Sequence, residues 1–213
     1  MPIVNAEVAI EGTRPLLWHH FGTDAIPLER EAKKGVAGHN PQEWEKTVLK
    51  LPNGQLYLEP AYIFGAIRDG ARHTRLGRGS LQPKLTSTLQ VRDDKILIDR
   101  WVPKGLQLLI MAEDQPVYLD VRSVRNPATR GRNIRYRVAA SPGWKTTFTI
   151  YWENTIVHEN QMRSIVKDAG AFQGLGDGRT IGFGRFEITS FELTESERAK
   201  KPAAKRSVAR PKA

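Results

Sequence analysis

The sequence predicts an α+β fold whose core runs strand, helix, two strands, helix and strand. Three observations predict it: alternating apolar residues near the start and towards the end, two segments with apolar residues at helical spacing, and a block of strand-like segments between them. At 213 residues, with 39% hydrophobic and 26% charged residues, the chain has the size and composition of one domain with elaborations. We expect that domain to span 1–194, with insertions at 13–58 and 80–116.

The first strand and the first helix are predicted from local patterns. IVNAEVAIEG (3–12) alternates apolar and polar residues, as a half-buried strand does. The segment 44–60 is typical of a short hairpin that turns at Pro52-Asn53-Gly54. The segment 59–79 predicts a helix, because Pro60 suits a first turn and the apolar residues after it recur at helical spacing.

The middle of the chain is rich in strand-like segments. KILIDRWV (95–102) and LQLLIMAE (106–113) predict short strands of an inserted element. VYLDVRSV (117–124), NIRYRVAA (133–140) and KTTFTIYWE (145–153) predict strands of the core. The proline and glycine between the last two predict that these two strands form a hairpin.

A second helix and a final strand complete the pattern. HENQMRSIVKDAGAF (158–172) has apolar residues at helical spacing, and GRFEITSFEL (184–193) alternates. With the insertions set aside, the order is βαββαβ, which is the ferredoxin-like or RRM-like arrangement. That arrangement places two helices on one face of an antiparallel four-stranded sheet and leaves the other face free, as RNA-recognition modules do. Many unrelated enzymes share it, so the fold by itself does not give a function.

The charge of the chain points to an anionic partner. Lys and Arg total 33 against 23 acidic residues, which gives a net charge of +10. Nucleic acid is the commonest partner for such a chain, and an anionic membrane surface is the alternative. The basic segment 195–213 has little to bury, so we expect a disordered tail that either aids solubility or holds phosphates.

The composition also limits the function classes. The chain has no cysteine, which excludes disulfides and thiolate metal sites and fits a reducing compartment. No apolar run approaches the length of a membrane span, and the N-terminal residues lack the pattern of a secretory signal. We therefore expect a cytoplasmic protein without a membrane partner.

GLGDGRTIGFGRF (174–186) is the most unusual stretch, with five glycines and two arginines between the second helix and the last strand. It lacks the GxxxxGK[ST] pattern of a P-loop and the GxGxxG spacing of a dinucleotide fingerprint. Two interpretations remain: a turn that needs positive φ angles, or a loop whose bare amides approach phosphates. We favour the second interpretation, and the residues expected to bind are Gly174, Gly176, Gly178, Arg179, Gly182, Gly184 and Arg185.

Two groups of arginines are further candidates for phosphate contacts. One group follows a single stripe of the first predicted helix and its end, where like charges repel one another unless an anion is present. The other lies in 120–137, and the planar fork of arginine binds phosphate and stacks on bases. A solvated charged face is the alternative for both groups. Their members are Arg68, Arg72, Arg75 and Arg78, and Arg122, Arg125, Arg130, Arg132, Arg135 and Arg137.

The element order and two of these stretches resemble the RAMP superfamily, the RRM-fold proteins of CRISPR effector complexes. GLGDGRTIGFGRFEI is similar to the glycine-rich loop of that family, which typically ends in G-[FY]-G-[RK]-[FV]. LEPAYIFGAIRDGAR is similar to the helix start [IL]P-x-S-x-[IL]-x-G-x-[IL]-R of the backbone-forming members. Pro60, Ile63, Gly65, Ile67 and Arg68 match that pattern, and the family's serine is absent.

The resemblance implies an RNA-binding role in antiviral defence. It implies contact with the backbone of a single-stranded guide RNA without readout of its sequence. The resemblance also implies assembly with other subunits of a ribonucleoprotein complex, or with further copies of this chain. A single-stranded DNA partner, and a lone protein of a phage or mobile element, are equally compatible with the residues.

Two other functions remain open from the sequence. RNA-cleaving members of the family place a histidine near the glycine loop as a general acid and base, so a metal-independent endoribonuclease using His19 or His20 is one alternative. A phage-like assembly protein whose basic tail meets nucleic acid incidentally is the other. Adjacent residues diverge on a strand, so His19 and His20 do not suit one metal ion. With no nucleotide motif and no nucleophile–base arrangement, we expect no cofactor and no metal.

Overall fold

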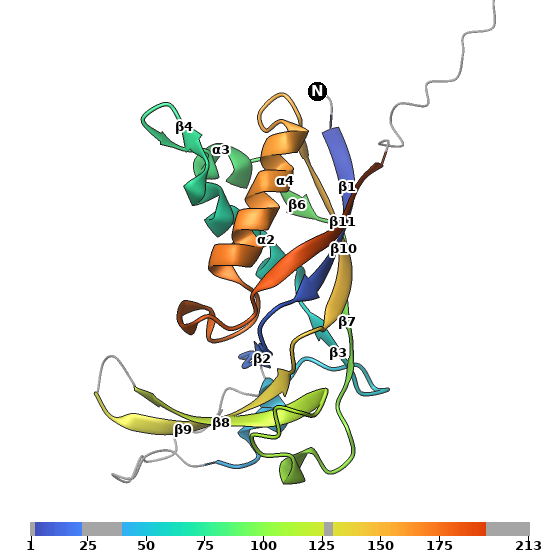
Figure 1. The fold of residues 1–213 in the computed structure, drawn as a ribbon, viewed down its shortest axis with the longest axis vertical. Coiled ribbons are helices and arrows are strands. Elements are labelled where there is room, and N and C mark those ends of the chain that lie inside the picture. Colours follow the sequence, from blue (N-terminus) through green and yellow to red (C-terminus); the bar gives the residue numbers. More distant parts are fainter. Residues whose placement is uncertain (1–2, 23–39, 126–129, 195–213) are drawn as a thin grey trace, which may run out of the picture.

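The computed structural model describes residues 3–22, 40–125 and 130–194 (Figure 1). The predictions for the tail at 195–213 and for part of the first insertion therefore lie outside the described residues. Within them, the protein is α+β with antiparallel sheets, as the sequence predicts. No described helix combines the length and the hydropathy that a membrane crossing requires.

The main sheet has four strands in the order β11-β1-β10-β6, and every neighbouring pair is antiparallel. The central strand β1 alternates as predicted, because Ala6, Val8 and Ile10 are fully buried while the residues between them are more exposed. The bounds of the four strands are β1 Ile3–Gly12, β6 Gln90–Val91, β10 Lys145–Glu153 and β11 Phe186–Thr194.

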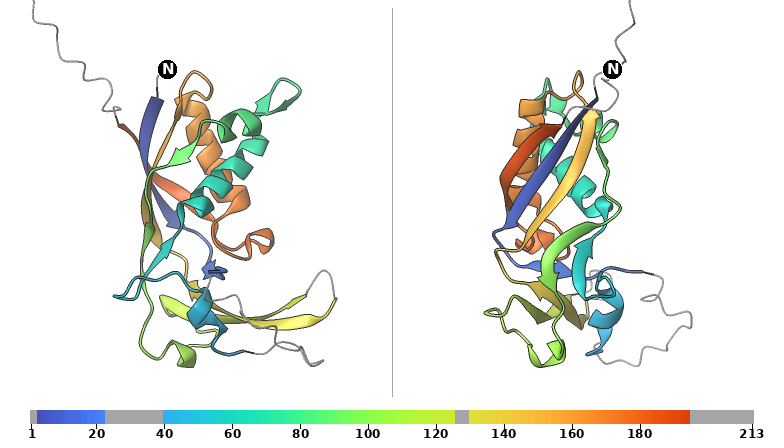
Figure 2. Two further views of the ribbon diagram at one scale, coloured as in Figure 1. Left: turned by 180° about the vertical axis from the view of Figure 1, so that it is seen from behind. Right: turned by 90° about the vertical axis from the view of Figure 1, so that its right-hand side faces the viewer.

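Helices α2 (Pro60–Gly70) and α4 (Glu159–Asp168) cover one face of this sheet (Figure 2). Pro60 begins α2, where its missing N–H costs nothing. Gly70 lets the helices approach closely, since a Cβ on it would lie 2.8 Å from the Ile165 carbonyl oxygen. The helix ends continue as a 3₁₀ turn at Ala71–His73 and a π turn at Ala169–Gln173.

A second sheet lies below the first and holds three strands in the order β2-β9-β8. Strands β8 (Val117–Arg125) and β9 (Arg132–Ala140) form a long hairpin, here called the arm, which extends beyond the helices (Figure 1). Strand β2 (Leu16–Trp18), which follows β1 in the chain, pairs with β9 of the arm.

The predicted hairpin between 133–140 and 145–153 is wrong. Strand β9 pairs with β8 and β2, whereas β10 pairs with β1 and β6. The turn between β9 and β10 is present, but its backbone bonds go to the end of β1: Gly143 donates to the Gly12 carbonyl, and Gly12 donates to the Trp144 carbonyl. These bonds carry the chain from one sheet into the other.

The fourth strand of the main sheet, β6, falls in the segment that the sequence analysis set aside as an insertion. The predicted strand at 95–102 is confirmed as β7 (Ile96–Trp101), which pairs with β3 (Gln55–Leu58). The predicted strand at 106–113 is wrong, because that segment begins with a 3₁₀ turn at Leu106–Leu108 and contributes only a bridge between Ile110 and Leu119.

The remaining elements are short. The predicted hairpin that turns at 52–54 is confirmed in part. Gly54 donates to the Leu51 carbonyl and Lys50 forms an antiparallel bridge with Leu56, but residues 43–47 form a helix. The predicted helix at 59–79 ends early, and its last residues form a small hairpin. These elements are α1 Glu43–Thr47, β4 Arg75–Leu76, β5 Gly79–Ser80, α3 Gln82–Thr86 and a 3₁₀ turn at Arg179–Ile181.

Candidate nucleic-acid interface

The glycine-rich loop (174–185) connects the end of α4 to β11 and is packed against the protein. All five of its glycines have positive φ angles between 68° and 95°, which other residues rarely adopt. A Cβ on Gly184 would lie 1.9 Å from the Leu175 carbonyl oxygen, and one on Gly176 would lie 2.4 Å from the Leu17 carbonyl oxygen. Gly182 differs, because a Cβ there would meet nothing within 4 Å. The fold of the loop itself therefore requires most of these glycines.

Many amides of the loop are already used inside the protein. Asp177 donates to the Leu17 carbonyl, Gly184 to the Pro15 carbonyl and Leu175 to the Gly184 carbonyl. The amides of Gly174, Ile181, Gly182 and Phe183 also donate to backbone carbonyls. An amide that already donates is not free to hold a phosphate, so these seven amides are not available for the predicted cradle.

Two ion pairs hold the loop, one on each side. On one side the Asp177 carboxylate accepts from Arg137 Nη1 at 2.8 Å, and Arg137 Nη2 donates to the fully buried Asp120 at 3.0 Å. On the other side Arg179 Nη1 lies 4.0 Å from Asp69 of α2. The loop is thus tied to the arm and to α2 at once. Neither acidic partner was a candidate from the sequence.

Some of the predicted arginines form ion pairs with a carboxylate and others do not. Arg68 and Arg72 both lie beside Asp69, at 3.0 and 3.5 Å, and Arg135 is paired with Glu43. Arg122 donates to Asp120 at 2.6 Å, which raises the pKa of its guanidinium. Arg137 is 4% exposed and both of its terminal nitrogens bind carboxylates, so it holds the loop and is not available to a phosphate.

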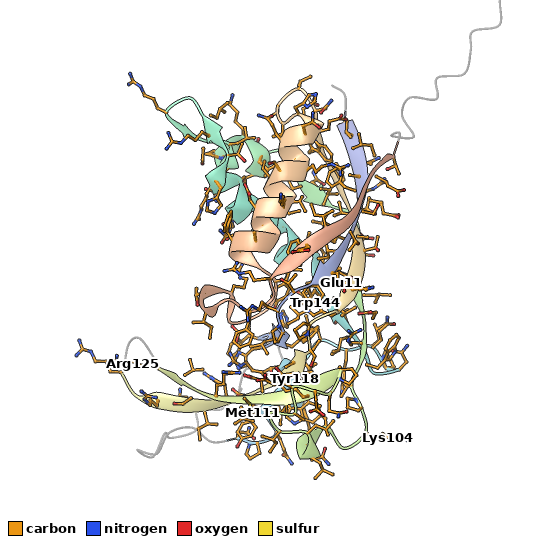
Figure 3. All side chains as sticks on the ribbon, viewed as in Figure 1. Glu11, Lys104, Met111, Tyr118, Arg125 and Trp144 are labelled. Atoms are coloured by element: carbon orange, nitrogen blue, oxygen red, sulfur yellow. The ribbon has the colours of Figure 1, made fainter. Side chains whose placement is uncertain are left out.

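The other predicted arginines have no such partner. No carboxylate oxygen of a described residue lies within 4.0 Å of the guanidinium groups of Arg75, Arg78, Arg125, Arg130, Arg132 or Arg185. Arg125 and Arg132 face each other across the arm, and Figure 3 places Arg125 at its far end. Like charges directly opposite one another on a hairpin destabilise it unless an anion joins them. An anion bound at the end of the arm would therefore stabilise the protein.

Arg185 lies at the end of a groove of about 1240 Å³ beside the loop. Its Nη1 is buried without a hydrogen-bond partner, and its Nη2 donates to the Arg179 carbonyl at 3.4 Å. Burial, with a contribution from the charge of Arg179, lowers the pKa of Arg185. No carboxylate of a described residue compensates the charge of Arg185, so the part of its side chain that faces the groove favours an anionic oxygen.

The residues that line the groove near Arg185 include Arg14, Arg122, Gly182 and Phe183. The Arg122 guanidinium lies over the Phe183 ring, 5.2 Å from its centroid, which fixes both side chains at the rim. Arg14 was not a candidate from the sequence, because it falls in the segment 13–58 that was expected to be an insertion. A basic residue directly after the central strand was the available signal.

His19 and His20 lie outside this groove and make separate contacts. His19 Nε2 lies 3.3 Å from Glu43, and His20 Nδ1 lies 3.3 Å from the Tyr62 hydroxyl. Burial raises the pKa of Tyr62, helped by Glu59 and Asp177, so its phenol stays protonated. In the described residues, no cluster of three or more His, Asp or Glu side chains suits a metal ion.

The carboxylate of Glu43 joins α1 to the arm. Burial raises its pKa, but hydrogen bonds from His19, from the Tyr136 amide and from Arg135 outweigh burial, and the net pKa lies below the ordinary value. Glu43 is therefore ionised at neutral pH, and its carboxylate fixes the side chains of Arg135 and His19 in place. This arrangement is a structural junction at the base of the arm.

Comparison with known proteins shows a likeness in fold. The chain matches no protein-family model and no curated protein. Among solved structures it is similar to a chain of the cryo-EM structure of the Type III-B Cmr-beta bound to cognate target RNA. The TM-score is 0.51 at 14% identity, with 91% of this chain and 61% of that chain covered. The chain thus spans less than two thirds of its structural neighbour, and at this identity the likeness concerns the fold.

Proposed function

We propose that this protein binds single-stranded RNA through the phosphate backbone and acts as a CRISPR-associated subunit of the RAMP type. The observation that carries the proposal is Arg185, a half-buried cation without a carboxylate partner among the described residues, in a groove that it shares with Arg14 and Arg122. The fold likeness to a chain of an RNA-bound complex supports it. The Gly182 turn, which is open on the groove side, leaves room for a backbone to approach.

The arrangement of the main sheet supports a ferredoxin-like core. We assign its four strands to β1, β6, β10 and β11 and its two helices to α2 and α4. The sheet order β11-β1-β10-β6, antiparallel throughout, is the order that a βαββαβ chain gives in that fold. The arm and the β3–β7 pair are then additions to the core within one domain of residues 1–194.

Binding in the groove is independent of sequence in this proposal. The groups at the loop end are guanidinium groups, a phenylalanine ring and a glycine turn, and phosphate contacts carry no base information. Phe183 offers a ring on which a base can stack, and such stacking tolerates every base. The partners are therefore single-stranded RNA, with single-stranded DNA as the alternative, and other subunits or copies in a cytoplasmic complex.

The test is fluorescence anisotropy of the full chain with a labelled single-stranded RNA across a salt series. We expect Arg185→Gln to weaken binding about tenfold, because a charge-assisted hydrogen bond contributes about 1.5–3 kcal/mol. The slope of log affinity against log salt should also fall by about 0.7 for the lost phosphate contact. Arg92→Gln is the matched control, since Arg92 is exposed beside β6 and does not line the groove.

Two results would contradict the proposal. Equal loss in Arg185→Gln and Arg92→Gln would mean that only net charge matters. Loss of all binding when 195–213 is removed would favour the assembly-protein alternative, in which the tail alone meets nucleic acid.

Cleavage of the RNA in EDTA that depends on His20 would instead support the endoribonuclease alternative, for which the contact of His20 with Tyr62 is the supporting observation.

A further inference from the structure

The groove does not end at the glycine-rich loop. It continues upward between α4 and the edge strand β11, which lie side by side in Figure 1. No residue of this second part was a candidate from the sequence. The residues that line it, here called the α4–β11 track, are Asn160, Arg163, Ser164, Lys167, Thr189 and Ser190.

The charges along the whole groove are unbalanced. It is lined by five basic side chains and two acidic ones, Glu113 and Glu187, and Glu113 already faces Arg122 at 3.6 Å. No carboxylate oxygen of a described residue lies within 4.0 Å of the charged groups of Arg14, Arg163, Lys167 or Arg185. Because unpaired cations on one concave surface raise the local potential, the groove favours an extended polyanion.

The track presents hydrogen-bond donors at regular helical spacing. Asn160, Arg163, Ser164 and Lys167 follow one another at i, i+3, i+4 and i+7, so they form one stripe of α4. The opposite stripe, which includes Ile165, is buried against the sheet. Together with Thr189 and Ser190 on β11, the two walls offer the groups that proteins use to hold phosphate and sugar oxygens.

Arg163 also decides between two occupants of the track. An extended peptide would bind by adding a strand to the free edge of β11. Arg163 Nη2 donates to the Phe191 carbonyl of that edge at 2.9 Å, and its guanidinium lies 4.8 Å from the centroid of the Phe191 ring. A peptide strand would have to displace these contacts, whereas a phosphate can meet the remaining N–H groups of Arg163.

We propose that the α4–β11 track holds the nucleotides that flank those at the glycine-rich loop. The inference rests on the proposed function and extends it from a point contact at Arg185 to a footprint along α4. Lys167, Ser164 and Asn160 contact phosphate and sugar groups there. Longer single strands therefore bind more tightly than short ones until the track is filled.

The first test compares oligonucleotides of about 4, 8, 16 and 30 nucleotides, a range that brackets the site sizes of single-strand binding modules. Lys167→Gln should weaken the binding of the longer strands about three- to tenfold and leave the shortest unchanged. Lys84→Gln, on the exposed face of α3, is the control and should change neither. Both are surface substitutions, so both variants should keep the wild-type melting temperature.

The second test is independent of affinity. Because the chain has no cysteine, Ser164→Cys places a single thiol in the track for a photo-activated cross-linker. We expect cross-linking to labelled 30-nucleotide RNA from Ser164→Cys, and none from the control Ser87→Cys beside α3. If the wild-type protein binds no strand at all, the proposed function fails. If it binds but Lys167→Gln is equal to wild type and Ser164→Cys does not cross-link, this inference fails while the proposed function stands.

Discussion

Substitution of Asp177 in the glycine-rich loop has opposite expected effects on RNA binding, depending on whether its charge or its ion pair dominates. An acidic group in a phosphate-binding loop repels the ligand, so electrostatics alone predicts that Asp177→Asn tightens RNA binding. The structure predicts the opposite. Asp177 accepts from Arg137 Nη1 at 2.8 Å and thereby holds the loop against the arm, so its loss releases the loop.

The size of the effect follows from the exposure of the pair. The Asp177 side chain is 42% exposed and that of Arg137 is 5% exposed, so the contact is screened on one side only. Such a contact contributes about 1 kcal/mol, towards the upper end for exposed pairs. If that energy holds the binding conformation, its loss weakens binding about fivefold.

The assay is anisotropy with labelled RNA at one fixed salt concentration, with hydrogen exchange of the loop amides as a second readout. Glu187→Gln is the matched control, because Glu187 lines the same groove and has no ion pair within the described residues. We expect Glu187→Gln to tighten binding slightly and Asp177→Asn to weaken it and to speed exchange at 174–184. Tighter binding by both variants would refute the role of Asp177 in positioning the loop.

Three further predictions concern stability. Arg137→Met should destabilise the fold by about 3 kcal/mol in denaturant unfolding, because it leaves the buried Asp120 with a single cationic partner; a change below about 1 kcal/mol would contradict this. Gly184→Ala should cost at least about 2 kcal/mol, against about 1 kcal/mol for Gly182→Ala, because only the former meets backbone atoms; equal melting temperatures would count against the packing of the loop. Glu43 has a lowered pKa in the folded state, so its contribution is present above its unfolded pKa and is lost as the pH falls through its folded pKa. The stability of wild type should therefore drop more than that of Glu43→Gln between about pH 6 and about pH 3, and parallel curves would show that the carboxylate does not contribute.

Elements with a strong local pattern could be predicted from the sequence. The alternation in 3–12 and the helical spacing in 158–172 gave β1 and α4 within a few residues. Strand β6 has two residues and no periodicity of its own, so nothing local distinguishes it from a loop. The pairing of β9 could not be predicted for another reason. The proline–glycine turn after β9 predicts a change of direction, but it does not show that Gly143 bonds to Gly12, which is 131 residues earlier in the chain.

The residue types of the candidate site could be predicted from the sequence, but the ion pairs among them could not. The arginines and glycines were all visible, but Arg137 and Arg135 are committed to acids that lie 40 and 92 residues away. Sequence patterns do not reveal such distant partners. Arg163 and Lys167 were not candidates from the sequence, and they line the groove because β11 returns beside α4.

The most direct measurement of the central claim is photo-cross-linking of the full wild-type chain to a thiouridine-substituted single-stranded RNA, with the attached peptides identified by mass spectrometry. If RNA follows the groove, the cross-linked peptides cluster at the glycine-rich loop around Phe183 and along α4 around Lys167. Cross-links confined to 195–213, or spread over the surface without the loop, would contradict the claim.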